Sequence, residues 1–116
     1  MDEPTTQSLR QKKCLPCEGG VPVIEAEQAA KYMNTAPSWQ LSDDAKWVSR
    51  QVVCKNFIEV MRLVNRIAEL AEADGHHPDL HITGYRNLKV DLTTHAIGGL
   101  SENDFILAAK IDQVFD

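Results

Sequence analysis

The most regular alternation of apolar and polar residues lies in the middle of the chain. Over residues 56–73, apolar side chains recur every three or four positions and charged side chains occupy the opposite face, which is the pattern of an amphipathic helix. Gly75 and Pro78 follow at once, and both residue types are typical of the end of a helix. The pattern therefore predicts a long helix, with His76 and His77 in the turn that follows it.

Four shorter segments have the period-two pattern of β-strands. Residues 39–41 and 46–54 predict one hairpin, with a turn of polar residues between its arms. Residues 80–85 and 88–94 predict two more strands, and in the last of these every second residue is apolar.

Helical spacing of apolar residues also marks a segment near the start of the chain and another at its end. The first runs from Pro22 to Met33, and the second follows Ser101, a residue type that commonly caps a helix. The order of predicted elements is thus α-β-β-α-β-β-α. Strand pairs separated by a helix favour an α+β domain, in which a four-stranded antiparallel sheet is covered by helices on one face.

Residues 1–21 lack apolar periodicity and end in two glycines. We therefore expect them to form a flexible N-terminal extension that contributes little to the core, while residues 22–116 form a single domain. Cys14 and Cys17 form a CxxC pair in this extension, which is compatible with half of a zinc site or with a redox couple. The third thiol, Cys54, lies far along the chain, so neither chemistry is the favoured interpretation.

The composition is that of a small acidic globular protein. The chain has 116 residues and a formal net charge of −5, which argues against direct nucleic-acid binding because such binding depends on clustered lysine and arginine. No apolar run reaches the roughly 18 residues of a membrane span, and the first residues have no signal-peptide pattern. Three cysteines are too few for a disulfide framework. We expect a soluble, cytoplasmic protein.

Three of the four histidines, His76, His77 and His95, lie within about twenty residues. Imidazole exchanges protons near neutral pH, with an ordinary pKa of about 6.5, so this grouping indicates acid/base chemistry. A zinc hydrolase with three histidine ligands is the alternative, but adjacent histidines rarely converge on one ion and the chain has neither an HxH nor an HExxH motif. The fourth, His81, is expected to be a surface residue of a strand.

These histidines belong to a longer pattern with fixed gaps. The pattern consists of Glu72, three residues, His76-His77-Pro78, six residues, Tyr85, nine residues, His95, eight residues and Asp104. It resembles the signature of the pterin-4a-carbinolamine dehydratase family, and the resemblance extends over residues 39–115.

The resemblance implies a hydro-lyase that dehydrates 4a-hydroxytetrahydrobiopterin (pterin-4a-carbinolamine) to quinonoid dihydrobiopterin and water, in the recycling of tetrahydrobiopterin. It implies the α+β fold, no metal or other cofactor, and a homodimer or homotetramer. Animal members of the family also bind the dimerisation segment of a homeodomain transcription factor. A protein-interaction module that acts like a transcriptional coactivator is therefore an alternative to the enzyme.

The resemblance also assigns roles to residues. His76 is expected to be the principal acid at the 4a-hydroxyl group, His95 its counterpart, and His77 a positioning or alternate acid/base group. The substrate site is expected to consist of these histidines and their neighbours Gly75, Thr93, Thr94 and Ala96.

Three further signature residues, Glu72, Tyr85 and Asp104, are expected to support the site. Asp104 is also three residues beyond Ser101, where a carboxylate caps a helix, and this structural role is the favoured interpretation. The chain departs from the animal-type members between Pro78 and Tyr85, where it is one residue longer and lacks their aromatic residue. At this position the sequence therefore offers no aromatic residue that could form a wall of the substrate cleft.

Overall fold

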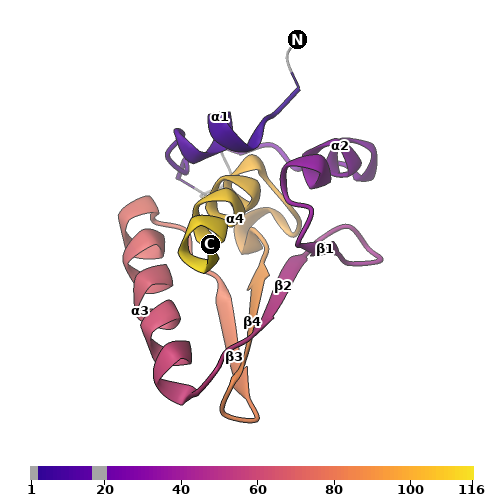
Figure 1. The fold of residues 1–116 in the computed structure, drawn as a ribbon. Coiled ribbons are helices and arrows are strands. Elements are labelled where there is room, and N and C mark those ends of the chain that lie inside the picture. Colours follow the sequence, from indigo (N-terminus) through magenta and orange to yellow (C-terminus); the bar gives the residue numbers. More distant parts are fainter. Residues whose placement is uncertain (1–2, 17–20) are drawn as a thin grey trace.

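The computed structural model describes residues 3–16 and 21–116 as four α-helices, two short 3-10 helices and four strands (Figure 1). In chain order these elements are α1 (Thr6–Arg10), α2 (Ala26–Tyr32), η1 (Met33–Thr35), β1 (Gln40–Leu41), β2 (Val48–Val53), α3 (Phe57–Asp74), β3 (Asp79–Thr83), β4 (Asn87–Leu92), η2 (His95–Ile97) and α4 (Glu102–Phe115).

The strands form one antiparallel sheet in the order β1-β2-β4-β3. β4 lies inside the sheet, and its pairing with β2 starts with Leu92 opposite Val48. The alternate residues Leu88, Val90 and Leu92 are fully buried, whereas the residues between them belong to the polar face of the sheet. This alternation fixes the register, because a shift by one residue would expose the whole apolar set.

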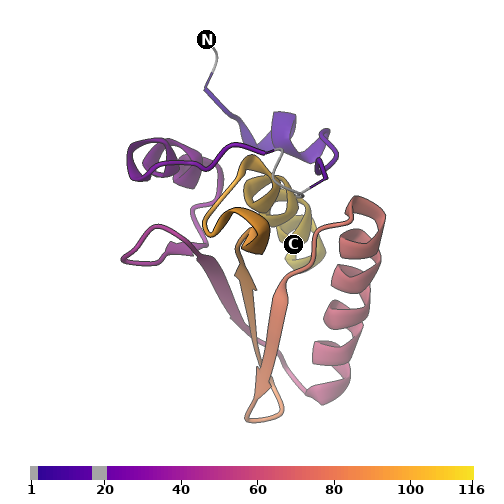
Figure 2. The same ribbon diagram turned by 180° about the vertical axis from the view of Figure 1, so that it is seen from behind.

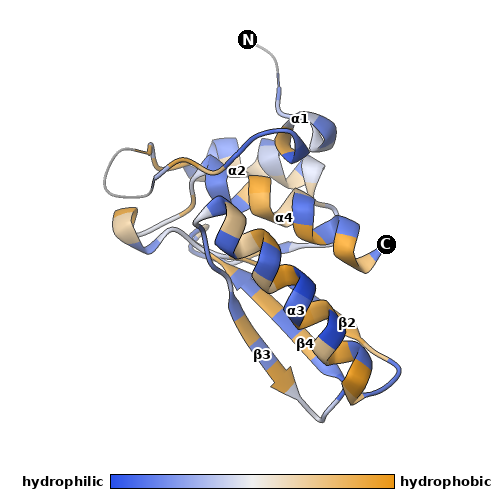
Figure 3. Ribbon diagram, turned by 90° about the vertical axis from the view of Figure 1, so that its left-hand side faces the viewer, coloured by the Kyte–Doolittle hydropathy of each residue, from blue (hydrophilic) through white to orange (hydrophobic). Residues whose placement is uncertain are grey.

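Helices α3 and α4 cover the apolar face of the sheet, and Figure 3 shows α3 in front of the strands. Val60 and Ile67 of α3 and Leu107 and Ile111 of α4 join the buried strand residues in one core. Burial of each such side chain contributes about 1.5–3 kcal/mol, so this layer supplies much of the stability. Within the described ranges no helix is long and apolar enough to cross a membrane.

The predicted fold class is confirmed, and the predicted long helix corresponds to α3. Several predicted bounds differ from the observed ones. Two of these differences have a cause in backbone contacts with another segment of the chain, at Ile24 and at Thr94. The first helix begins at Ala26 rather than Pro22, since the Ile24 N–H donates to the Leu100 carbonyl and keeps this segment extended. The last strand ends at Leu92 rather than at residue 94.

The expectation that residues 1–21 contribute little to the core is wrong for the described part of that segment. Leu9 is 0% exposed and belongs to the main core, and Cys14 is also buried. The Arg10 side chain donates to the Ala109 carbonyl of α4 at 3.2 Å. α1 therefore packs on α4, as both Figure 1 and Figure 2 show. A domain boundary at residue 22 and the flexibility of the extension stay predictions.

Replacing Leu9 by Ala should lower the free energy of unfolding by about 2–5 kcal/mol, because the change removes a fully buried side chain and leaves a cavity. The matched control is Leu15→Ala, since Leu15 lies in the same segment but is 62% exposed. This control should change stability by less than about 0.5 kcal/mol. Urea unfolding measures both values, and equal midpoints for the two variants would show that the N-terminal segment is not part of the core.

A group of exposed apolar side chains lies where α3 begins and the β3–β4 turn projects. It contains Val53, Phe57, Ile58, Ile82 and Tyr85, and we call it the end patch. The Cys54 N–H donates to the Arg86 carbonyl, which brings the end of β2 to this turn. In the ladder Val53 pairs with Asn87 and Ile82 pairs with Leu88, so the patch includes side chains on both faces of the sheet at this end. Several exposed apolar side chains at one end of a protein commonly mark a site of association.

We expect the chain to self-associate through the end patch. Light scattering should give a mass above the 13.0 kDa of one chain. Ile58→Lys should reduce the association, because it places a charge in the apolar contact. The control Leu15→Lys introduces the same charge at a comparably exposed residue outside the patch and should leave the mass unchanged. A wild-type mass of one chain at micromolar concentration would contradict the expectation.

Candidate active site

The first candidate segment is the turn that ends α3. Gly75 has φ 66°, in the left-handed region that glycine adopts without strain, and its N–H donates to the Ala71 and Glu72 carbonyls. The His76 N–H also donates to the Ala71 carbonyl, at 3.2 Å. Backbone hydrogen bonds at the end of the helix therefore fix the start of the histidine pair, independently of any side-chain contact.

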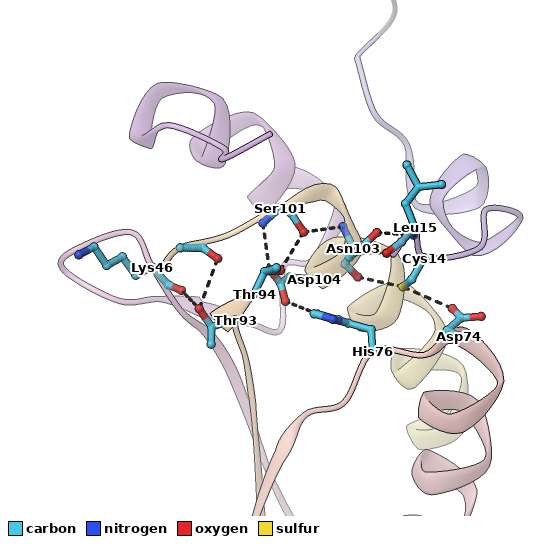
Figure 4. A network of polar contacts seen from close by, with 11 residues as sticks. Cys14, Leu15, Lys46, Asp74, His76, Thr93, Thr94, Ser101, Asn103 and Asp104 are labelled. Carbon is cyan, nitrogen blue, oxygen red and sulfur yellow. Dashed lines mark hydrogen bonds and ion pairs between the residues drawn. The ribbon is translucent and has the colours of Figure 1, made fainter. Parts of the chain in front are cut away.

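His76 points inward from this turn. The residue is 5% exposed, and its Nε2 lies 2.6 Å from Oδ1 of Asp104, at the start of α4. The pair joins residues that are 28 positions apart in the chain (Figure 4). A carboxylate on one ring nitrogen holds an imidazole in one orientation and determines which nitrogen carries the proton.

The Asp104 carboxylate is the centre of a buried network. It is fully buried and accepts hydrogen bonds from the Ser101 N–H at 3.0 Å and from the Thr94 hydroxyl at 2.8 Å, besides its contact with His76. The Ser101 side chain in turn accepts hydrogen bonds from backbone N–H groups in the first turn of α4, so Ser101 and Asp104 form a capping box. This confirms the capping role expected for Asp104 and adds a direct contact with a candidate catalytic histidine.

The second candidate segment follows β4. Thr93 and Thr94 are buried, and the backbone of Thr94 pairs with Gly99. This pairing turns the chain into η2, so His95 is the first residue of a 3-10 helix instead of a strand residue. His95 and Ala96 are exposed. The structure thus brings this segment to His76 through the bond between Thr94 and Asp104.

His77 points away from the network and pairs with Glu72 instead. Its Nε2 lies 2.8 Å from Oε1 of Glu72, and both side chains are exposed. Glu72 therefore contacts the imidazole of His77, and its role in support of the site stays a prediction. Tyr85 does not join the group, since it lies in the turn at the opposite end of β3 and belongs to the end patch. His81 pairs with Asp91 on the polar face of the sheet, as expected for a surface residue.

The thiols lie apart from these contacts. The Cys14 thiol donates to the Asn103 carbonyl at 3.5 Å and to Asp74, whereas Cys17 lies outside the described residues. Burial raises the pKa of the Cys54 thiol, and the negative charge of Glu59 adds to this effect. Among the described residues no group of three His, Cys, Asp or Glu side chains is arranged to hold a metal ion.

One residue near the site has no place in the resemblance. The Trp47 ring contacts the His95 ring, with 5.6 Å between the ring centroids. The alternation of residues 46–54 placed Trp47 in a strand. No local pattern indicated that its neighbour is a histidine 48 positions later, because this contact depends on the pairing of β2 with β4.

Comparison with known proteins identifies the class to which this fold and site belong. Residues 22–114 match the sequence model of the family described as pterin 4 alpha carbinolamine dehydratase. The chain is 47% identical over 105 residues to a provisionally named pterin-4-alpha-carbinolamine dehydratase of Halorhodospira halophila, and this match covers 90% of the chain and 95% of the relative. A relative of the same name from Methylococcus capsulatus is 45% identical over 107 residues, with 92% and 93% covered. The chain belongs to the pterin-4a-carbinolamine dehydratase family.

A solved structure supports the fold. The chain resembles a transcriptional coactivator/pterin dehydratase from Brucella melitensis with a TM-score of 0.74, and the match covers 80% of this chain and 98% of that one. The sequences are 24% identical, so this likeness concerns the fold alone.

Replacing Asp104 by Asn should lower the free energy of unfolding by about 1–3 kcal/mol, because one amide oxygen cannot accept all the bonds that the carboxylate accepts. The variant should also lose a downfield ring N–H resonance of His76 in NMR spectra. Asp43→Asn, in an exposed loop, is the control for the loss of one negative charge. If both variants kept wild-type stability and the resonance, the network would not hold His76.

Proposed function

We propose that the chain dehydrates pterin-4a-carbinolamine by histidine acid/base catalysis, and that this activity recycles tetrahydrobiopterin. Membership of the family supports the reaction class. The observation that carries the mechanism is the bond from His76 to the buried carboxylate of Asp104. The same carboxylate accepts a hydrogen bond from Thr94, the residue directly before His95. Two of the three candidate histidines are thereby tied to one rigid centre.

The reaction needs an acid and a base at neighbouring atoms. The bond between carbon 4a and its hydroxyl oxygen breaks, and an acid donates a proton so that the oxygen leaves as water. A base takes the proton of the adjacent ring nitrogen, and the electron pair of that N–H bond forms the new double bond to carbon 4a. The sum is loss of one water molecule, with no change of oxidation state, so two groups that exchange protons near neutral pH suffice.

We assign these roles by the contacts of each imidazole. His76 is the principal acid, because the contact of its Nε2 with the Asp104 carboxylate fixes the orientation of the ring. His95 is the counterpart base. It is exposed at the start of η2, and the residue before it, Thr94, is bonded to Asp104. His77 is the positioning or alternate group, since its partner Glu72 is itself exposed.

We assign substrate recognition to the main chain of the segment that follows β4, residues 93–96. The Thr93 hydroxyl donates to the Lys46 carbonyl at 2.5 Å and the Thr94 hydroxyl donates to Asp104, so both side chains point into the protein. The exposed residues of the segment are His95 and Ala96, and Gly75 is exposed in the turn beside His76. Main-chain donors and acceptors suit the polar edge of a pterin ring.

A protein-interaction role is the second candidate, and the end patch favours it. Five exposed apolar side chains lie at the end of the sheet that is farthest from η2. A surface for association and a site for dehydration can therefore coexist on one chain. An association that Ile58→Lys abolishes without loss of dehydratase rate would support this division.

The purified chain should accelerate dehydration of a 4a-hydroxytetrahydropterin without added metal and keep this activity in EDTA. His76→Ala and His95→Ala should each lower turnover about a hundredfold or more, the usual scale for loss of a general acid or base. The matched control is His81→Ala, because His81 is an exposed histidine on the polar face of the sheet. It should keep wild-type turnover.

Two outcomes would overturn this proposal. Losses of tenfold or less in both His76→Ala and His95→Ala would place the acid and base elsewhere. Activity that EDTA abolishes and zinc restores would replace acid/base catalysis by histidines with metal catalysis.

A further inference from the structure

Trp47 is the side chain that connects the hairpin of β1 and β2 with the candidate site. Its ring centroid lies 5.6 Å from that of His95, and the two ring planes make an angle of 79°. Trp47 is partly exposed, whereas the second tryptophan, Trp39, is 3% exposed and donates its ring N–H to Asp112 at 2.8 Å. Trp39 is thus a core residue, and Trp47 presents an indole surface next to a candidate catalytic group.

The loop before β2 holds Trp47 in place. The Ser42 N–H donates to the Trp47 carbonyl at 2.9 Å, and the Trp47 N–H donates to the Ser42 hydroxyl oxygen at 3.0 Å. The Ser42 hydroxyl donates to the carboxylate of Asp44, and this bond lowers the pKa of Asp44. Both backbone groups of Trp47 are therefore bonded to one residue, which limits the movement of the backbone that carries the indole.

A second connection ties this loop to the substrate segment. The Lys46 carbonyl accepts the hydroxyl bond of Thr93 at 2.5 Å. Val48 lies opposite Leu92 in the β2–β4 ladder, so the residue before Val48 faces the residue after Leu92. Trp47 therefore lies across the ladder from the segment that leads to His95, and backbone bonds fix this relation.

We propose that the indole of Trp47 is the surface on which the flat bicyclic ring of a pterin stacks, next to His95. This inference rests on the proposed function and specifies how the same site binds its substrate. Aromatic side chains bind flat heteroaromatic rings by stacking, and a partly exposed indole on a rigid loop loses little side-chain entropy in doing so.

The angle between the two protein rings suits the chemistry. A ligand ring parallel to the indole lies nearly perpendicular to the His95 imidazole, because the imidazole is nearly perpendicular to the indole. The hydroxyl group on the tetrahedral carbon 4a projects out of the plane of the pterin ring. An imidazole perpendicular to that plane can exchange a proton with groups at the face or edge of the ring while the indole supports it.

The test compares Trp47→Leu and Trp47→Phe with wild type. Biopterin, which is fully oxidised and cannot be dehydrated, serves as the binding probe, and its own fluorescence reports the titration. Trp47→Leu should raise the dissociation constant of biopterin and the KM for the carbinolamine about tenfold each, which corresponds to about 1.4 kcal/mol. Trp47→Phe should recover most of both losses, because a benzene ring still stacks. A purely structural role would be seen as a lower unfolding midpoint without this rescue.

The control is Phe57→Leu, which removes an aromatic ring of 48% exposure in the end patch. It should bind biopterin as wild type does. Wild-type affinity in Trp47→Leu, or no binding of biopterin to the wild type, would overturn the stacking role. Binding that depends on Trp47 in a chain without dehydratase activity would keep the stacking role and overturn the proposed function. Turnover that is insensitive to Trp47 would overturn the stacking role alone.

Discussion

The buried carboxylate of Asp104 is the interaction on which both the fold and the candidate site depend. A charge without contact to water costs several kcal/mol unless hydrogen bonds compensate for the lost hydration. Here the partners come from three separate segments, namely the end of α3 through His76, the end of β4 through Thr94 and the start of α4 through Ser101. The positive end of the α4 dipole adds a further favourable contribution. The same contacts that satisfy this charge bring the candidate histidine segments together, so stability and site geometry cannot vary independently.

Structural features that depend on residues within one helix or strand could be predicted from the sequence. The apolar stripe of α3 and the alternation in β4 gave the fold class, and the spacing of Ser101 and Asp104 gave the cap of α4. In each case the residues that determine the structure are neighbours in the chain. The resemblance then supplied the candidate histidines, and membership of the family is confirmed.

Features that depend on distant segments could not be predicted in this way. α1 has one buried apolar residue, Leu9, which gives no period, and its burial depends on α4 about a hundred positions later. His95 leaves the strand pattern because Thr94 pairs with Gly99. The contact of Trp47 with His95 arises from strand pairing. The site therefore combines residues selected by local spacing with residues that only the tertiary structure brings near.

Gly75 ends α3 directly before His76 and His77, Gly98 ends η2, which begins at His95, and both glycines have φ 66°. A Cβ built on either residue would meet no heavy atom within 4 Å, so neither position requires a small residue. The cost of replacing these glycines is purely conformational, because an L-amino acid in the left-handed region is strained by roughly 1–2 kcal/mol. For a D-amino acid this region is the mirror image of the ordinary right-handed one, so its backbone would fit both turns without strain. The constraint at the two turns is therefore one of chirality and not of volume.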